Sequence, residues 1–587
     1  MTKLHDFLEA EDNFSWWLVC GDGGSGKSRL ALALCDECLS QGWRAGFVKA
    51  RTAGYQDICR DDWTTWRPTT PTLVILDYAA SYMQEELNPG VVSDKADLVH
   101  IINALNNASV QSGQRVRLLL LEREYRQKSQ EDNLAYPENQ TWYSKLVETF
   151  AREQAAVTGL RHAEPLILNH LDDDALWRIM QSVAAHEEAR LEEGNKADML
   201  KQLREIDPQG RPLFAIFLAT ITANSADDGG RWDREKLIRE ILLREYTNYW
   251  MPAGLTLNDI NLLVFATLCG GVSSLPELPA QVTTLEAMNS DGELLDRFLS
   301  LGLAINQGTD VHISPVQPDL VGEYFVLKQN VPIQRGSSVC QLIQAAWRHA
   351  PLACARFFDH CRVDFFNLRE LFQLFYGCSG RESQGSPSTF LWSLVAFNLV
   401  IDYGDAGDLA EARAIFDAMP AGSPELELIH AKAAFNLVNG YRKAGDLAEA
   451  RAVFDAMPAG SPELELRHAK AAVNLVSAYG DAGDLAEARA IFDAMPAGSP
   501  ELDLERAKAA VNLVSAYGDA GDLAEARAVF DAMPADDPQL TVWHVAANIV
   551  LHIFCGELAE AWRLWENMDD GEIKALLRAL LEQSSSQ

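Results

Sequence analysis

The stretch Gly21-Asp-Gly-Gly-Ser-Gly-Lys-Ser28 fits the pattern G-x-x-x-x-G-K-[ST] at every fixed position. It follows the apolar run 16–20, which predicts a buried strand, and precedes a helical pattern from Ser28 to Gln41. In this context backbone N–H groups surround a phosphate, and the helix points its positive N-terminal end at the same anion. We therefore expect Lys27 to reach the β- and γ-phosphates and Ser28 to ligate Mg²⁺. The loop itself would consist of Gly21, Gly23, Gly24, Ser25 and Gly26. The competing interpretation is a glycine-rich turn that binds no ligand.

Further apolar runs predict the other strands of a parallel sheet, at 44–49, 72–77, 117–123 and 166–168. The run 72–77 ends in Asp77, and a carboxylate at the carboxyl end of a buried strand can hold Mg²⁺ through water. We expect Asp77 to join Ser28 in this role, the alternative being an ordinary acid at a strand end. The run that ends in Glu122-Arg123 makes Arg123 a candidate sensor of the γ-phosphate. Solvation of the strand end by these two side chains is an equally good explanation.

Length and charge restrict the class of protein. A chain of 587 residues exceeds one hydrophobic core and predicts about three to five domains. Its net charge of −34 repels a phosphate backbone, so nucleic acid is an unlikely partner. No apolar run approaches the roughly 20 residues that span a bilayer, and the first residues do not form a secretion signal. We expect a cytoplasmic protein without membrane contact, in which the Cys35 and Cys38 thiols fill the core rather than bind a metal.

After Asp172 the periodicity becomes helical, and Gly210-Arg-Pro212 followed by an apolar run predicts another helix start. Two further helices and a strand pair are expected at 259–269, 294–303 and 304–314, an arrangement that suits a winged helix.

The order of these segments resembles that of the STAND signalling ATPases, the class that includes the NB-ARC and NACHT regulators and bacterial antiviral sensors. The resemblance covers residues 10–335. It implies ATP or ADP and Mg²⁺ as ligands, contact of Pro212 with the adenine, and a chain that works as a switch.

Two positions depart from the family pattern. Relatives often carry a His that touches the β-phosphate where this chain has Pro318, so that contact cannot be transferred, and nearby His312 is expected to be packed or solvated. Relatives also carry a second acid after the strand-end aspartate, where this chain has Tyr78. Either Glu122 or an acid from the following segment activates the water, or ATP hydrolysis is slow.

The C-terminal third of the sequence repeats itself. A motif Asn-Leu-Val followed by Tyr recurs every 38 residues, at Asn398, Asn436, Asn474 and Asn512. The predicted turns between paired helices lie at Gly407, Gly445, Gly483 and Gly521. A degraded fifth copy around Gly556 is expected to cap the array.

The repeats are similar to tetratricopeptide repeats, and the copy at 436–457 also resembles pentatricopeptide repeats, which read single-stranded RNA. The repeat at 474–511 carries seven acids and three bases, which favours a protein or peptide ligand over RNA. Two adjacent positions vary between copies and mark either ligand contacts or neutral drift. These are Ile401, Asn439, Ser477 and Ser515, with Asp402, Gly440, Ala478 and Ala516 beside them.

The predicted fold class is α/β plus all-α, with a parallel sheet in a P-loop NTPase domain and an α-solenoid of about five tetratricopeptide-like repeats. The predicted boundaries are 1–165 for the NTPase domain, 166–250 for a helical domain, 251–335 for a winged-helix-like domain, 336–390 for a helical linker, 391–570 for the repeats and 571–587 for a tail. The predicted function is an ATP/ADP-dependent switch in which a ligand on the repeats drives self-association, with antiviral defence as the setting that the resemblance implies. The alternatives are an adaptor that acts through a separate effector protein and an RNA-binding repeat protein.

Overall fold

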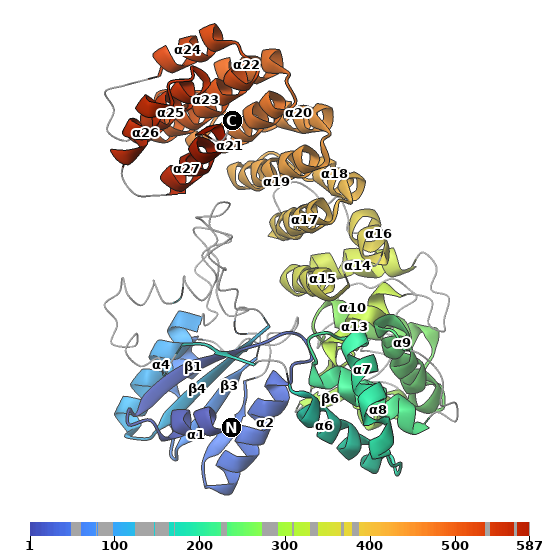
Figure 1. Ribbon diagram of the computed structural model, residues 1–587. Coiled ribbons are helices and arrows are strands. Elements are labelled where there is room, and N and C mark those ends of the chain that lie inside the picture. Colours follow the sequence, from blue (N-terminus) through green and yellow to red (C-terminus); the bar gives the residue numbers. More distant parts are fainter. Residues whose placement is uncertain are drawn as a thin grey trace. The chain divides into compact units, whose positions relative to one another are not determined.

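The computed structural model is mostly helical and contains a five-stranded parallel sheet (Figure 1). It describes residues 1–48, 60–77, 79, 98–123, 146, 162, 164–168, 171–224, 232–272, 292–307, 310–328, 338–365, 369–378, 387–533, 540–568 and 572–585. The chain divides into two compact units, Met1–Phe365 and Phe366–Gln587. None of the helices in the described ranges combines the length and apolarity needed to cross a bilayer.

The sheet of the first unit forms from the predicted apolar runs. Its strands are β1 (Phe14–Cys20), β2 (Arg44–Phe47), β3 (Thr72–Leu76), β4 (Val116–Glu122) and β5 (Leu166–Ile167). All are parallel, in the order β2-β3-β4-β1-β5. Every residue of β1, β3 and β4 is buried, because strands of a parallel sheet are covered on both faces. The predicted strands are confirmed.

Two apolar cores lie on opposite faces of this sheet. Side chains of α1 (Thr2–Glu9) and α2 (Lys27–Ser40) pack with Trp17 and Val19 on one face. Side chains of α3 (Arg60–Thr65) and α4 (Leu98–Ser112) pack with Trp16 and Leu18 on the other. Figure 1 shows α2 and α4 on the two sides of the sheet. The Cys35 and Cys38 thiols belong to the first core, as predicted, and burial raises their pKa values to about 11 and about 12.

A buried arginine in β4 fastens α1 to the sheet. The Arg117 side chain is 0% exposed, and its guanidinium donates to the Phe7 carbonyl at 2.8 Å and to the Ala10 carbonyl at 2.6 Å. These carbonyls lie at the end of α1, where a helix leaves its last acceptors unpaired. A side chain more than 100 residues further along the chain therefore supplies donors to the end of the first helix.

The rest of the first unit is almost entirely helical. Its elements are α6 (Asp173–His186), α7 (Lys196–Ile206), α8 (Pro212–Asn224), α9 (Arg234–Glu245), α10 (Leu257–Leu268), α12 (Gly292–Ser300), the antiparallel pair β6 (Ala304–Gln307) and β7 (Asp310–Ile313), α13 (Asp319–Leu327), α14 (Ser338–His349) and α15 (Pro351–Phe365). The predicted helices and strand pair form here. Helices α14 and α15 lie in the stretch predicted as a linker, yet they pack on α10 and α13 within the first unit.

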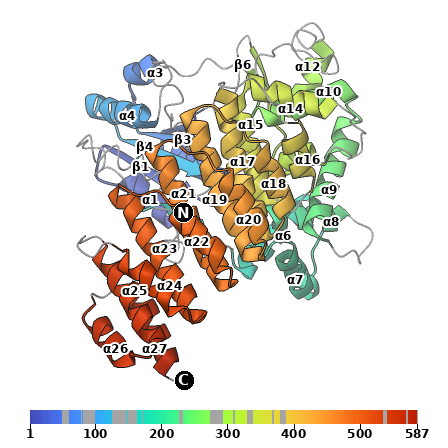
Figure 2. The same cartoon turned by 90° about the horizontal axis from the view of Figure 1, so that it is seen from above.

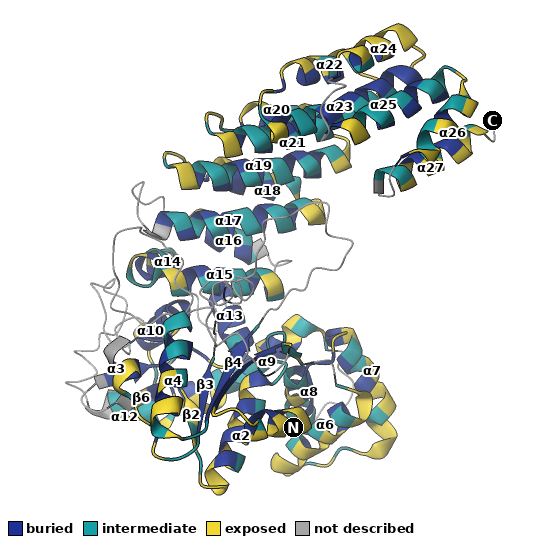
Figure 3. Cartoon of the chain, turned by 90° about the vertical axis from the view of Figure 1, so that its left-hand side faces the viewer, coloured by how far each residue is buried: buried dark blue, intermediate teal, exposed yellow. Residues whose placement is uncertain are grey.

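The second unit begins with α16 (Arg369–Cys378) and continues as stacked helix pairs. The pairs are α17 (Pro387–Ala406) with α18 (Leu409–Asp417), α19 (Pro424–Ala444) with α20 (Leu447–Asp455), α21 (Pro462–Asp481) with α22 (Leu485–Asp493), α23 (Pro500–Asp519) with α24 (Leu523–Asp531), and α25 (Thr541–Phe554) with α26 (Leu558–Glu566). The first helices of successive pairs lie side by side (Figure 2), and the outward surfaces of α22 and α24 are exposed (Figure 3). The predicted repeat array is confirmed.

The repeated residues explain this stacking. Ser461 caps α21 by accepting a hydrogen bond from the Leu464 N–H, and a proline follows it in the first turn, as at Ser423 and Ser499. The turn glycines Gly407, Gly445, Gly483, Gly521 and Gly556 all have positive φ. A last helix, α27 (Glu572–Ser585), packs on α25 and α26, so the fifth pair is itself covered.

Candidate functional site

The glycine-rich loop between β1 and α2 has a backbone that only glycine suits. Gly24 and Gly26 adopt φ of 79° and 91°, in the left-handed region. A Cβ added at Gly24 would lie 2.9 Å from Leu213 Cβ, and one at Gly21 would lie 2.8 Å from Ser25 Oγ. Ser25 Oγ is a buried atom without a hydrogen-bond partner in the described part of the chain. The loop thus combines tight backbone packing with an unsatisfied hydroxyl, which a phosphate oxygen would satisfy.

The Lys27 side chain, which follows the glycines, turns back onto the loop. Lys27 is 8% exposed, and its Nζ donates to the carbonyl oxygens of Gly21 at 2.6 Å and Asp22 at 3.1 Å. Burial, reinforced by nearby Arg123, lowers the pKa of Lys27. The loop therefore holds a cation that is poorly solvated, and an anion placed beside it would restore its electrostatic balance.

The two predicted metal residues are in direct contact. Ser28 Oγ donates to Asp77 Oδ2 at 2.7 Å. Burial raises the pKa of Asp77, although the Ser28 hydrogen bond and the Lys27 charge oppose this. A hydroxyl and a carboxylate are oxygen ligands of the kind Mg²⁺ takes together with phosphate and water. Among the described residues no group of three His, Cys, Asp or Glu side chains is arranged to hold a metal ion, so phosphate and water would complete the ligands of Mg²⁺ beside Ser28 and Asp77.

The strand order explains why these residues meet. Strand β4 lies between β1 and β3, so the carboxyl ends of all three strands are adjacent, with Cys20 opposite Glu122. Glu122 Oε1 accepts a hydrogen bond from the Arg123 N–H at 2.7 Å, and the Glu122 carbonyl accepts one from the Gly21 N–H at 3.3 Å. The crevice at the carboxyl ends of parallel strands is the usual ligand site of such sheets.

Arg123 reaches away from the sheet end into a group of carboxylates. Its Nη2 lies 2.9 Å from Asp319 Oδ2 and 3.0 Å from Glu323 Oε1, at the start and in the middle of α13. Its Nη1 lies 3.5 Å from Asp364 Oδ2, near the end of α15. Burial raises the pKa of Glu323 to about 8. Arg123 therefore does not solvate a strand end; it joins the sheet to two later helices.

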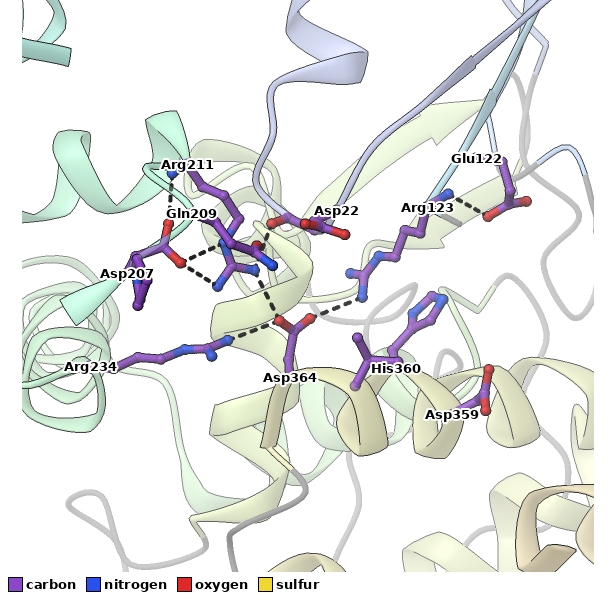
Figure 4. Close-up of a pocket in the computed structure, with 13 residues that line it drawn as sticks. Asp22, Glu122, Arg123, Asp207, Gln209, Arg211, Arg234, Asp359, His360 and Asp364 are labelled. Carbon is purple, nitrogen blue, oxygen red and sulfur yellow. Dashed lines mark hydrogen bonds and ion pairs between the residues drawn. The ribbon is translucent and has the colours of Figure 1, made fainter. Parts of the chain in front are cut away.

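Two more arginines meet the same aspartate (Figure 4). Arg211 Nη1 lies 3.1 Å from Asp364 Oδ1 and donates to the Gly23 carbonyl at 3.1 Å. Arg234 Nη2 lies 2.9 Å from Asp364 Oδ1. Asp207 also binds Arg211, at 3.0 Å from Nη2. The residues surround a cavity of about 510 Å³ next to the loop.

The sequence did not reveal this group. Arg211 lies within the Gly210-Arg-Pro212 segment and Asp207 shortly before it, so both carried a local signal, whereas Glu323 and Asp364 are isolated acids within helices. The predicted residue Pro212 begins α8 beside the loop, and the Leu213 N–H next to it donates to the Gly24 carbonyl at 3.4 Å. His312 is 8% exposed and packed in β7. Tyr78 lies outside the described residues.

The repeat positions that vary between copies are of two kinds. Gly440 is buried, and a Cβ there would lie 3.0 Å from Leu409, so packing between helices restricts this position. Ala478 and Ala516 are buried as well. The neighbouring positions, such as Asn439 and Ser477, are partly exposed. Only this second kind is available to a partner.

Comparison with known proteins identifies the repeats. The tetratricopeptide repeat model matches residues 394–418, 469–494 and 507–532, and the PPR repeat model matches residues 436–459. No curated protein matches the chain. The C-terminal array is therefore tetratricopeptide- and pentatricopeptide-like, a class of helical repeat that serves as an interaction module for protein or RNA.

Proposed function

We propose that the chain is an ATP- and ADP-dependent signalling switch in which the first unit binds nucleotide and the repeats bind a protein or peptide ligand. The observation that carries this proposal is the contact between Ser28 and Asp77, formed at the end of a loop whose Gly24 and Gly26 adopt a left-handed backbone conformation. It brings together a hydroxyl, a carboxylate and the buried Lys27 ammonium, the groups that Mg²⁺ and a polyphosphate require.

In this proposal Gly21, Gly23, Gly24, Ser25 and Gly26 surround the phosphates, while Lys27 neutralises their charge. Mg²⁺, when bound, would be held by Ser28 with Asp77 behind it, and would screen the phosphate charge. Pro212, beside the loop at the start of α8, would contact the base as the resemblance to STAND ATPases implies. That resemblance is also the source of the winged-helix assignment for 251–335 and of self-association in the ATP state.

Lys27→Ala tests the site. The substitution removes the cation from the loop and little from the core, so we expect calorimetry on the full chain to show loss of ATP and ADP binding with an unchanged unfolding temperature. Lys3→Ala, a change of an exposed lysine in α1, is the matched control. ATP affinity in Lys27→Ala equal to that of the unaltered chain would refute the nucleotide site.

Hydrolysis is expected to be slow. Glu122 lies at the strand ends beside Arg123, and its carboxylate already accepts a backbone hydrogen bond. With Tyr78 in place of a second acid, we propose turnover well below the ~10 s⁻¹ typical of enzymes. Asp77→Asn should lower this turnover more than it lowers ATP affinity.

RNA binding by the array is the second candidate function, because the PPR repeat model matches residues 436–459. Charge opposes it: the repeat at 474–511 holds seven acids against three bases. Retention of single-stranded RNA on a filter at low salt, lost as salt rises, would favour this candidate over a protein ligand.

A further inference from the structure

The carboxylate of Asp364 is the shared partner of three arginines that come from separate elements. Arg123 follows β4, Arg211 precedes α8, and Arg234 begins α9. The Asp364 side chain is 5% exposed, and those of Arg123 and Arg211 are 11% and 7% exposed. Arg234 is 32% exposed, and Arg123 and Arg211 also pair with other acids, but Asp364 is the one carboxylate that all three arginines share within the described part of the chain. The arginines thus form an anion site that a side chain of the same protein now occupies.

The fit between Asp364 and this site is incomplete. Among the described residues Asp364 Oδ2 has no hydrogen-bond partner, and its ion pair with Arg123 is long, at 3.5 Å. Arg234 Nε is also a buried atom without a hydrogen-bond partner in the described part of the chain. A planar carboxylate offers two oxygens, whereas a terminal phosphate offers three in a tetrahedral arrangement. The larger anion would accept more of the donors that the three arginines present.

The site adjoins the phosphate loop. A Cβ added at Gly23 would lie 3.2 Å from Asp364 Oδ2 and 3.4 Å from Arg123 Cζ. Arg211 also donates to the Gly23 carbonyl. The cavity of about 510 Å³ is lined by loop residues as well as by the three arginines and Asp364. Figure 4 shows the Asp364 carboxylate pointing into the space between the arginines.

We propose that Arg123, Arg211 and Arg234 form a binding site for the terminal phosphate of a nucleoside triphosphate, and that Asp364 is the internal anion that competes for it. The inference rests on the proposed function, since it assumes that the loop holds the inner phosphates. A diphosphate leaves Asp364 in place, whereas a triphosphate displaces it. Asp364 is next to Phe365, the last residue of the first unit.

The alternative is a buried ion cluster that only fixes α15. The two interpretations differ in their effect on nucleotide choice. Asp364→Asn keeps the side-chain shape and removes the competing charge, so we expect about tenfold tighter binding of a non-hydrolysable ATP analogue with Mg²⁺ and unchanged binding of ADP. Arg234→Ala should do the opposite, weakening binding of the analogue about tenfold or more and that of ADP by less than about threefold.

Calorimetry on the full chain measures the affinity of each variant for the ATP analogue and for ADP. Asp359→Asn is the control for the carboxylate, because Asp359 lies on the same helix and lines the same cavity but points away from the arginines (Figure 4). Arg239→Ala, an exposed arginine of α9, is the control for Arg234. If Asp364→Asn does not fold, Arg234→Ala still decides, because its side chain is 32% exposed and less of the core depends on it.

The outcomes separate this inference from the proposed function. Suppose that both nucleotides bind in a way that depends on Lys27, and that the ratio of analogue affinity to ADP affinity is the same in Asp364→Asn, Arg234→Ala and the unaltered chain. That result overturns the arginine site and leaves the proposed switch standing. Absence of any nucleotide binding by the unaltered chain overturns both.

Discussion

The two units of the chain are stabilised by contacts of very different range. In the first unit Arg123 pairs with Asp319, 196 residues away, and Arg211 pairs with Asp364, 153 residues away. In the second unit the Tyr479 hydroxyl donates to the Leu447 carbonyl across 32 residues, and Arg451 pairs with Glu487 across 36. Long contacts also fasten α1 to the sheet through Arg117, whereas the short ones recur from repeat to repeat.

This difference predicts different responses to damage. A buried network made of distant segments is lost as a whole when one member is removed, because the remaining charges stay buried without partners. A repeat array contacts only its neighbours, so a defect weakens one interface and leaves the next intact. The predictions below test this contrast, beginning with the largest expected effect.

Arg117→Met should destabilise the first unit by roughly 2–5 kcal/mol, because it leaves the buried Phe7 carbonyl and the partly buried Ala10 carbonyl without the donors they have now. Hydrogen exchange should increase in α1 and β4 but not in α19 to α23. Protection lost equally in the repeats would show that the two units unfold together.

The stability of the first unit should fall as pH rises from about 6.5 to about 8. Burial raises the pKa of Glu323 to about 8, so in this range the folded chain keeps a proton that the unfolded chain, with an ordinary carboxyl, has released. Each rise in pH then favours unfolding. Burial lowers the pKa of His360 below its ordinary value of 6.5. Above that pH the His360 side chain is neutral in both the folded and the unfolded chain, so it opposes this trend only at lower pH.

Glu323→Gln is the test of this pH dependence. It retains the shape of the side chain beside Arg123 and removes the titration. Between pH values of about 6.5 and about 8, the midpoint of thermal unfolding should therefore change by several °C less in the variant than in the unaltered chain. An equally steep pH dependence in the variant would assign the effect to another group.

Equivalent glycines in the array should respond in opposite directions. A Cβ at Gly518 would collide with the ring of Phe554, so Gly518→Ala should cost about 1–3 kcal/mol at the junction with the fifth pair. At Gly404, which occupies the same repeat position, a Cβ meets nothing within 4 Å. Gly404→Ala should therefore stabilise α17 by about 0.5–1 kcal/mol, measured by urea unfolding. Similar costs at both positions would mean that helix packing is not the deciding factor.

The smallest effect is expected from the ionic ladder on the outer helices. Arg451 Nε lies 2.8 Å from Asp455 Oδ1 of its own helix, and Arg451 Nη1 lies 3.0 Å from Glu487 Oε2 of the next repeat. Arg413 and Arg489 reach the next repeat in the same way. The acids are half exposed, so Arg451→Ala should cost less than ~1 kcal/mol. A cost as large as that of Arg117→Met would contradict the contrast between the units.

Much of the fold could be predicted because its signals are local. The apolar runs gave the strands, since a strand buried on both faces must be apolar throughout. The 38-residue repeat and the turn glycines predicted the helix pairs of the array, because each pair repeats the same contacts with its neighbour. The glycine-rich loop was visible for the same reason: its backbone conformation is set by residues next to one another.

The surroundings of the loop could not be predicted this way. The sequence by itself determined the strands, the loop and the repeats, together with the candidates Lys27, Ser28 and Asp77. Only the tertiary structure brought Arg123, Arg211 and Arg234 to Asp364, placed α14 and α15 in the first unit, and covered the last repeat with α27. The physical reason is that a buried charge cluster depends on side-chain positions fixed by the packing of several helices and a sheet. An isolated Asp or Arg within a helix carries no pattern that distinguishes it from a solvated residue.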